Sequence, residues 1–365
     1  MANQRPEVPS RNLVVCLDGT SNEPEVGVTN VARLFDMAIK DHDQLVYYDP
    51  GVGTMGARSA TTPVGKSLTR VAGLVVGFGI RDNIAEAYSW LMANFRAGDR
   101  IYLFGFSRGA YTALALAGML RTVGLLSPGA DNLVPYALKM YAKNSSRELT
   151  PADEKHYWET RGAFASKFGN PDFNRFARNV TFLGLWDTVK TVGWLNTRAR
   201  FEQAHWPFTR NVKNVKTGRL AMSIDENRRP FPEYRFAADQ VHERPDDLKE
   251  VWFAGVHSDI GGQFEDHKLS DIALGWIAEE AIAAGLRVDA GRFKDLVGAP
   301  PGTALPAAHA VEGKIHYHPW YWALAGGWRR RHIAATDALH PSVRQRIDGT
   351  ASGPKPFRPD LRDHR

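Results

Sequence analysis

The 365-residue sequence lacks several features that define whole classes of protein. It contains a single cysteine, Cys16, which excludes a disulfide framework within the chain and a zinc site built from several thiolates. No stretch reaches the roughly 18 apolar residues that a membrane-spanning helix needs. Residues 1–11 are polar and include two prolines, so we expect no secretory signal peptide. We find no internal repeat and no low-complexity linker.

Nucleotide-binding signatures and a strong charge imbalance are also missing. The triplet at 51–53 (GVG) does not continue as G-x-G-x-x-G, and no phosphate-binding loop is present. The chain carries 46 basic and 40 acidic residues, a formal net charge of +6. Such a mildly basic balance allows attraction to anionic lipid or to nucleic acid but requires neither. We therefore expect no nucleic-acid partner.

The strongest local signal is a serine between an apolar strand and a helix. Residues 101–104 are an apolar run rich in β-branched and aromatic side chains, which predicts a buried strand, and residues 110–120 are good helix formers. Between them, residues 105–109 (GFSRG) fit G-x-S-x-G. This context is typical of a nucleophile elbow, where a strained turn exposes the serine beside the positive end of a helix. We predict that Ser107 is a nucleophile; the alternative is that it only caps the helix.

Strands and helices alternate along the rest of the chain. The apolar runs predict further strands, and the periodic segments predict helices. This alternation predicts an α/β fold of the α/β-hydrolase type, a mostly parallel sheet with helices on both faces. The strands are expected at 13–17, 45–48, 180–186 and 250–256, and the helices at 30–40, 80–95, 133–142, 152–168 and 269–284.

These elements also predict a domain plan. We expect a single domain over residues 12–345, with flexible tails at 1–11 and 346–365. A helical insertion at about 127–176 would form a lid over the serine. The basic segment 190–235 is expected to be irregular and to surround the pocket.

Four predicted strands end in side chains capable of chemistry. Ligands of parallel α/β sheets bind at the carboxyl ends of strands. A serine nucleophile needs a base, and the base needs an acid to orient it. Ser107, Asp187 and His257 occur in the chain order of the α/β-hydrolase triad. The four strand ends are Asp18-Gly19-Thr20, Ser107, Asp187-Thr188 and His257-Ser258-Asp259.

The histidine and the aspartate of this triad each have a competitor. His340 is the alternative base, because the base of many such folds lies near the C-terminus; it could instead start a helix. Asp259 lies two residues from His257 and competes with Asp187, but we expect it to support the histidine or the turn that follows. Asp187 could also act only as a cap together with Thr188.

An oxyanion hole requires backbone N–H groups that point to the developing negative charge. We expect one from Arg108, which follows the nucleophile, and a second from the loop at Asp18-Gly19-Thr20. The side chain of Arg108 has two open roles, neutralising a substrate phosphate or forming a salt bridge at the surface. This mechanism requires no cofactor and no metal.

Seven short motifs extend the signal over nearly the whole chain, from about residue 12 to 345. They are LDGT at 17–20, GFSRGA at 105–110, LWDTV at 185–189, SIDENR at 223–228, GVHSDIGG at 255–262, LSDIAL at 269–274 and HPSV at 340–343. Together they resemble the DUF2235 family of α/β-hydrolases, which includes the Tle1-type phospholipase effectors of bacterial type VI secretion. The resemblance implies an acyl-ester hydrolase whose triad falls on Ser107, Asp187 and His257.

The resemblance also implies a setting for the enzyme. The expected substrate is a phospholipid, with a smaller ester as the alternative. The expected partners are a membrane surface and an immunity or secretion-apparatus protein. The expected location is the cytoplasm of the producing bacterium, with delivery as a secreted effector. The aromatic segment 317–328, which three arginines follow, has a composition suited to a lipid interface, although it could equally be a packing segment.

Two rival functions remain open from the residues. Asp18, Asp187, His257 and Asp259 could hold a divalent metal for hydrolysis of phosphate esters, although no tight ligand spacing supports this. A non-catalytic lipid- or partner-binding member of the fold is the other rival. It has no need of an intact set of serine, histidine and aspartate.

Overall fold

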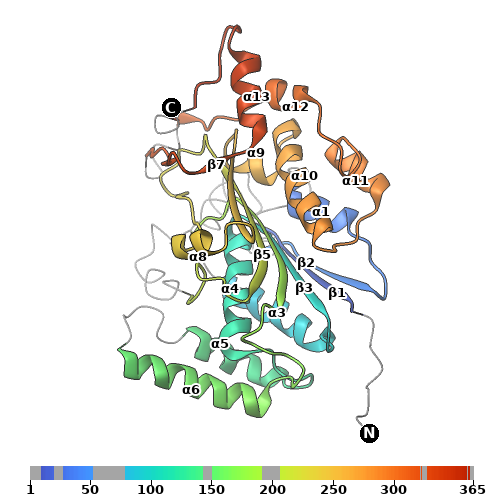
Figure 1. Ribbon diagram of the computed structural model, residues 1–365, viewed down its shortest axis with the longest axis vertical. Helices are drawn as coiled ribbons and strands as arrows, with labels where there is room; N and C mark the ends of the chain where they lie inside the picture. The colour runs from blue at the N-terminus through green and yellow to red at the C-terminus, as the bar shows by residue number, and fades with distance from the viewer. Residues whose placement is uncertain are drawn as a thin grey trace, which may run out of the picture.

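Seven parallel strands form one sheet in the order β2-β1-β3-β4-β5-β6-β7 within the described residues (Figure 1). The computed structural model describes residues 10–19, 28–51, 79–142, 150–190, 206–320, 322, 327–359 and 361. The fold is α/β and α/β-hydrolase-like, as the alternation of strands and helices predicts. The strands are β1 (Asn12–Leu17), β2 (Gln44–Asp49), β3 (Arg100–Phe106), β4 (Val180–Trp186), β5 (Val215–Ser223), β6 (Leu248–Phe253) and β7 (Ala338–Leu339).

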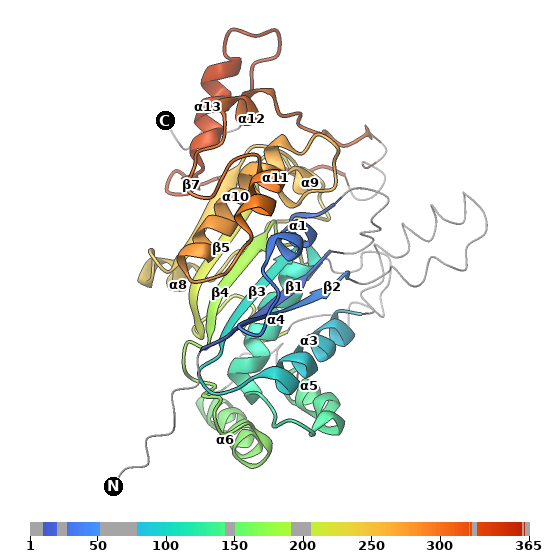
Figure 2. The same ribbon diagram turned by 90° about the vertical axis from the view of Figure 1, so that its right-hand side faces the viewer.

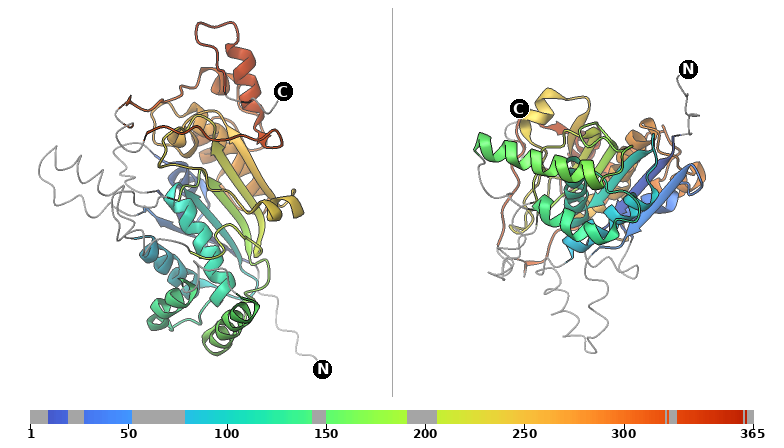
Figure 3. Two further views of the ribbon diagram at one scale, coloured as in Figure 1. Left: turned by 90° about the vertical axis from the view of Figure 1, so that its left-hand side faces the viewer. Right: turned by 90° about the horizontal axis from the view of Figure 1, so that it is seen from below.

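Helices cover both faces of the sheet. Figure 2 shows α1 (Asn30–Met37) and α10 (Lys268–Ala283) in front of the strands, with α11 (Ala290–Val297) packed on them. The left view of Figure 3, from the opposite side, shows α4 (Arg108–Val123) in front of the strands, with α3 (Ile80–Asn94) packed beside it. The remaining helices are the 3-10 turn η3 (Asp131–Leu133), α5 (Val134–Ala142), α6 (Pro151–Phe168), α8 (Ala238–Glu243), α9 (His257–Gly261), α12 (Ala307–Glu312) and α13 (Pro341–Thr350).

Burial on two faces explains why the central strands read as apolar runs. All six residues of β1 are buried, and so are six of the seven residues in each of β3 and β4. Neither face needs polar residues, so the period-two alternation of a half-exposed strand is absent. Cys16 lies in the middle of β1 as a buried free thiol, and burial raises the pKa of that thiol far above its usual value.

β5 corrects the expectation that residues 190–235 are irregular. This strand lies inside the sheet between β4 and β6. Its sequence contains Lys216, Gly218 and Arg219, which hide the strand pattern. The buried guanidinium of Arg219 donates to Glu280 of α10 at 2.9 Å. A charge inside a strand is tolerated here because a helix distant in sequence supplies its partner.

The insertion at 127–176 contains the two predicted helices, but they do not form a lid over Ser107. Helix α4 is 16 residues long, about 24 Å, and carries the chain away from the serine. A Cβ atom on Gly118, in the second half of α4, would lie 2.5 Å from the hydroxyl of Tyr141 at the end of α5. The amide of Ser127 donates to the carbonyl of Phe168 at the end of α6. Both helices therefore pack at the far end of α4, as Figures 1 and 3 show.

The predicted tails are also partly wrong. Arg346 is buried in α13 and donates to the carbonyls of Ala310 and Gly313 at 2.6 and 2.8 Å, and Phe357 packs against its guanidinium. At the other end, Arg11 pairs with Asp99 at 2.7 Å; residues 1–9 lie outside the described residues. In the part of the chain that the structure describes, no helix is long and apolar enough to span a bilayer.

Candidate active site

Ser107 occupies a strained turn between β3 and α4. Its backbone has φ 58° and ψ −120°, a region that costs a non-glycine residue about 1–3 kcal/mol. The flanking glycines permit the close approach of strand, turn and helix. A Cβ on Gly105 would lie 2.6 Å from the Ala110 backbone, and one on Gly109 would lie 2.1 Å from the carbonyl oxygen of Leu17. This is the geometry that the G-x-S-x-G pattern predicts.

The topology of the sheet places this turn where a ligand is expected. From β1 the chain runs outward to β2 and then returns across β1 to β3. The strand order therefore reverses between β1 and β3, and ligands of open α/β sheets bind at such a switch point, beyond the carboxyl ends of the strands. Ser107 lies at the carboxyl end of β3.

Three side chains from three strand ends form a hydrogen-bonded chain. Nε2 of His257 lies 2.8 Å from Oγ of Ser107, and Nδ1 of the same ring lies 2.6 Å from Oδ2 of Asp187. All three residues are buried. The imidazole can therefore donate Nδ1–H to the carboxylate and accept the serine hydroxyl at Nε2. These distances suit a nucleophile, its base and an acid that orients the base.

Aromatic packing fixes the ring of His257. The residue begins the short helix α9, immediately beyond β6. The Phe106 ring lies 4.7 Å from the imidazole on one side, and the Phe231 ring contacts it edge-on at 5.2 Å. Gly261 makes room for Phe106, because a Cβ there would lie 2.0 Å from that ring. Burial lowers the pKa of His257 below its usual value despite the neighbouring carboxylate. The ring is therefore neutral at pH 7 and can accept a proton.

Asp187 is held by more than the histidine. Its Oδ1 accepts the amide of Ser223 at 2.9 Å and a guanidinium N–H of Arg331 at 2.5 Å. A second N–H of Arg331 donates to Oδ2 at 3.0 Å. Burial acts to raise the pKa of Asp187, but Arg331 and His257 outweigh it and lower this pKa to about 2. The carboxylate is therefore ionised throughout the neutral range.

The residues expected around the oxyanion lie close to the elbow. Asp18 directly follows β1, and a Cβ on Gly109 would lie 2.5 Å from its carbonyl oxygen. The Oδ2 atom of Asp18 accepts the hydroxyls of Thr29 and Tyr48. The amide of Gly19 donates to Oδ1 of Asp18 at 2.7 Å, so in this conformation the carboxylate of Asp18 occupies the amide. The role of Gly19 as an oxyanion donor stays a prediction, because its amide would have to leave Asp18 and donate to the oxyanion instead.

Arg108 and Thr188 are buried beside the serine and the aspartate. The Arg108 side chain is buried and does not lie at the surface, where one of its two expected roles, a salt bridge, would place it. The same burial lowers the pKa of its guanidinium to about 10. The carbonyl of Thr188 accepts the amide of Tyr234 at 3.2 Å, and the amide of Val189 donates to the carbonyl of Ser107 at 3.4 Å. These backbone bonds tie the turn after β4 to the elbow.

The competing acid, Asp259, does not contact the imidazole of His257. Its Oδ2 accepts the amide of Val256, and its Oδ1 lies 2.6 Å from Nδ1 of His316. Asp259 therefore braces the start of α9, in line with the supporting role expected for it. His257, and not its competitor His340, is the histidine that contacts Ser107.

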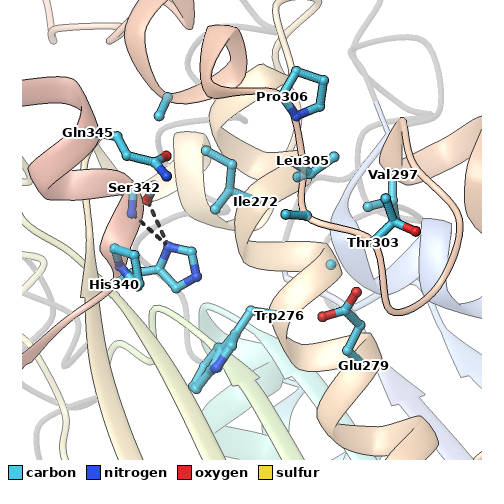
Figure 4. Close-up of a pocket in the computed structure, with 14 residues that line it drawn as sticks. Ile272, Trp276, Glu279, Val297, Thr303, Leu305, Pro306, His340, Ser342 and Gln345 are labelled. Atoms are coloured by element: carbon cyan, nitrogen blue, oxygen red, sulfur yellow. Dashed lines mark hydrogen bonds between the residues drawn. The ribbon is translucent and has the colours of Figure 1, made fainter. Parts of the chain in front are cut away.

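His340 caps α13 and accepts the amide of Ser342. It lines a pocket of about 260 Å³ between α10, the 303–306 loop and the start of α13, together with Trp276 and Glu279 (Figure 4). None of Ser107, Asp187 and His257 lines this pocket.

Sequence reasoning missed two residues of the site, Arg331 and Glu226. Arg331 is the third arginine of a run that suggests a solvated basic turn, yet it is buried. Glu226 accepts the amide of His257 at 3.2 Å and pairs with Arg228 at 2.8 Å and His318 at 3.0 Å. The only signal for Glu226 is its place in the motif at 223–228, whereas nothing local separates Arg331 from its neighbours.

The strand-end residues do not assemble into a metal site in the described ranges. Asp187 is occupied by Arg331 and His257, and Asp259 by His316. The described residues with converging ligand atoms are Asp41, His42 and Asp43, on the partly exposed turn before β2. The ligand set expected for a metal-dependent phosphate esterase is thus not brought together here.

Comparisons with known proteins place the chain in a family. The model of the type VI secretion phospholipase effector Tle1-like catalytic domain matches residues 11–280, nearly three quarters of the chain. The uncharacterized protein YEL023C of Saccharomyces cerevisiae is 34% identical over 234 residues, which cover 62% of this chain and 33% of that protein. The chain thus spans about a third of the length of this curated relative.

Two solved structures are similar at 18% identity. One is the Tle1 effector bound to the VgrG spike of the type 6 secretion system, with a TM-score of 0.38 over 70% of this chain and 52% of that chain. The other is an uncharacterized protein from Pseudomonas aeruginosa, with a TM-score of 0.41 over 77% of this chain and 46% of that chain. This chain therefore spans about half of each. By the family model that covers most of its length, the chain belongs to the Tle1-like catalytic domains of type VI secretion phospholipase effectors.

Proposed function

We propose that this chain is a serine hydrolase that cleaves carboxylic esters of phospholipids. The observation that carries the proposal is the continuous chain of contacts from Ser107 to His257 to Asp187, at 2.8 and 2.6 Å, at the switch point of the sheet. Membership of a phospholipase effector family supports a lipid ester over a small one.

The proposed reaction has two halves. Oγ of Ser107 attacks the ester carbonyl while His257 takes the hydroxyl proton at Nε2, and Asp187 stabilises the imidazolium. The tetrahedral oxyanion is stabilised by the amide of Arg108 at the positive end of α4. As the intermediate collapses, the imidazolium gives its proton to the departing alcohol and an acyl-serine remains. Water, deprotonated by His257, then releases the fatty acid and restores Ser107.

The test compares the wild type with Ser107→Ala on a short-chain p-nitrophenyl ester and on phospholipid vesicles, each with and without EDTA. Ser342→Ala is the matched control, because Ser342 also lies 2.8 Å from a histidine nitrogen, that of His340, away from the triad. We expect the wild type and Ser342→Ala to be active with or without EDTA, and Ser107→Ala to lose at least a factor of about 10³. An active Ser107→Ala protein that EDTA inhibits would overturn the proposal in favour of metal-dependent hydrolysis.

We further propose that two exposed aromatic side chains make contact with the lipid surface. Tyr317 and Trp320 are 67% and 77% exposed. They lie next to His316 and His318, whose contacts with Asp259 and Glu226 hold this segment beside the triad. Exposed Tyr and Trp favour the water–lipid boundary, and the formal net charge of +6 suits anionic headgroups.

The contact is tested with the double variant Tyr317→Ser and Trp320→Ser. We expect slower hydrolysis of anionic vesicles and an unchanged rate on the soluble ester. The matched control is Tyr136→Ser on α5, because Tyr136 is 56% exposed at the far end of α4. Equal rates of vesicle hydrolysis for the double variant and the wild type would refute the proposed contact of Tyr317 and Trp320 with the lipid surface.

Family membership also supports delivery as a secreted effector with a partner in the secretion apparatus. This is tested by following the tagged chain in the medium of the producing bacterium with and without an assembled secretion sheath. Equal amounts in both media would contradict it.

A further inference from the structure

Arg331 is bound more extensively to the site than any sequence pattern suggests. Its guanidinium forms a two-point contact with the carboxylate of Asp187, at 2.5 and 3.0 Å. The same group donates to the hydroxyl of Ser223 at 2.7 Å and to the carbonyl of Phe231 at 2.9 Å. Its side chain is only 2% exposed. With the carbonyl of Ser223, which accepts from the same guanidinium at 3.1 Å, five acceptor atoms orient this buried cation against the outer side of the aspartate.

This contact belongs to a pattern at three neighbouring strands. Acidic residues follow β4, β5 and β6, and each pairs with a basic side chain that lies after α12 in the chain. The three pairs are Asp187 with Arg331, Glu226 with His318 and Asp259 with His316. All three basic residues lie beyond residue 280, where the match to the family model ends. The part of the chain after residue 280 therefore supplies the basic partner of each of these three acidic residues.

We propose that Arg331 is a positioning residue that acts on His257 through Asp187; the inference rests on the proposed serine mechanism. The fork of two N–H groups fixes the plane of the carboxylate, so Oδ2 faces Nδ1 of the imidazole. Its positive charge also offsets part of the negative charge of Asp187. The imidazole then binds a proton less tightly than it would beside an uncompensated carboxylate, and it stays neutral at lower pH.

The sign of the expected effect follows from this charge. Without the cation, Asp187 stabilises the imidazolium more strongly, and the pKa of Asp187 itself rises because Arg331 no longer offsets the effect of burial. Each change lowers the fraction of the protein that has a neutral His257 and an ionised Asp187 at acidic pH, and this is the reactive form. The acid limb of the pH–rate profile therefore moves to higher pH when Arg331 is neutralised. A cation that only stabilised the fold would leave the midpoint of this limb in place.

The test measures the rate at which a fluorophosphonate probe labels Ser107 between pH 4 and 9. In this reaction the serine oxygen bonds to phosphorus, fluoride leaves and His257 takes the hydroxyl proton. The neutral variants are Arg331→Met and Arg331→Gln, Arg331→Lys keeps the charge without the fork, and Arg329→Met is the control because that side chain is exposed. Thermal unfolding of each variant identifies the folded proteins.

We expect the folded neutral variants to label at least tenfold more slowly at neutral pH, with the acid midpoint raised by about one unit. Arg331→Lys should label more slowly with the midpoint near that of the wild type, and Arg329→Met should match the wild type. An unmoved midpoint in the neutral variants would overturn the inference, and so would the failure of both to fold while Arg331→Lys folds. Absence of Ser107 labelling in the wild type would instead refute the proposed function.

Discussion

The strained backbone of Ser107 leads to a prediction about stability that separates strain from chemistry. Replacing this serine by glycine or by alanine removes the same hydroxyl and the same 2.8 Å contact with His257. The two variants differ in the Cβ atom, which φ 58° and ψ −120° disfavour. We therefore expect Ser107→Gly to be more stable than Ser107→Ala, the reverse of the usual order inside a helix.

The magnitude follows from two opposing terms. Relief of the disfavoured backbone is worth about 1–3 kcal/mol, and the extra conformational freedom of glycine in the unfolded chain costs about 0.5–1 kcal/mol. The lost hydrogen bond cancels in the comparison. The net advantage of glycine is about 1 kcal/mol, which in a chain of 365 residues raises the midpoint of thermal unfolding by about 1 °C.

The assay is thermal unfolding of the two variants side by side, with hydrolysis of a soluble ester measured on the same samples. Both variants should be inactive. Ala163→Gly, at an exposed position inside α6, is the control; there glycine should lower the midpoint, because no backbone strain is relieved. If Ser107→Gly unfolds below Ser107→Ala, the elbow does not store the strain that its dihedral angles indicate.

Three further predictions follow from the site and its supports. Because burial lowers the pKa of His257, the acid limb of kcat/KM on a soluble ester should have its midpoint below about 6.5; a midpoint above 7 would contradict the buried, neutral imidazole. Gly109→Ala should lower the midpoint of thermal unfolding or prevent folding, since the added Cβ would lie 2.1 Å from a carbonyl oxygen of β1; Gly162→Ala inside α6, where the nearest atom is a flexible arginine tip at 3.1 Å, should instead be neutral or stabilising. Glu226→Gln should cost about 3 kcal/mol at pH 7, because it breaks a buried ionic network. Burial raises the pKa of Glu226, but His318 and Arg228 more than offset it and hold this pKa below its usual value. The stabilising contribution is therefore complete above about pH 4.3 and is lost as the pH falls further. The difference in unfolding midpoint between Glu226→Gln and the wild type should narrow in acid, and a constant difference would contradict the assignment.

Much of the fold could be predicted from local patterns. β1, β3 and β4 are apolar runs because both of their faces are buried, and the G-x-S-x-G turn requires glycine wherever the backbone approaches closely. The order Ser107, Asp187, His257 was also readable, since parallel strands place their carboxyl ends at one edge. These features are encoded in residues that are neighbours in sequence, or in the simple rule that strands of one sheet run in parallel.

Other features were decided only by tertiary structure. The charged strand β5 depends on Glu280, which is distant in sequence, and the predicted lid packs at the far end because the length of α4 carries it away from the serine. The contact between Arg331 and Asp187 joins residues 144 positions apart. In the sequence Arg331 is one of three consecutive arginines. Only the folded chain places it against Asp187 after β4 and Ser223 at the end of β5, where it is buried. Burial of a charge is tolerated only when a well-placed partner compensates the loss of its water. The partner of Arg331 is 144 positions away in the sequence, so no local pattern could reveal the pair.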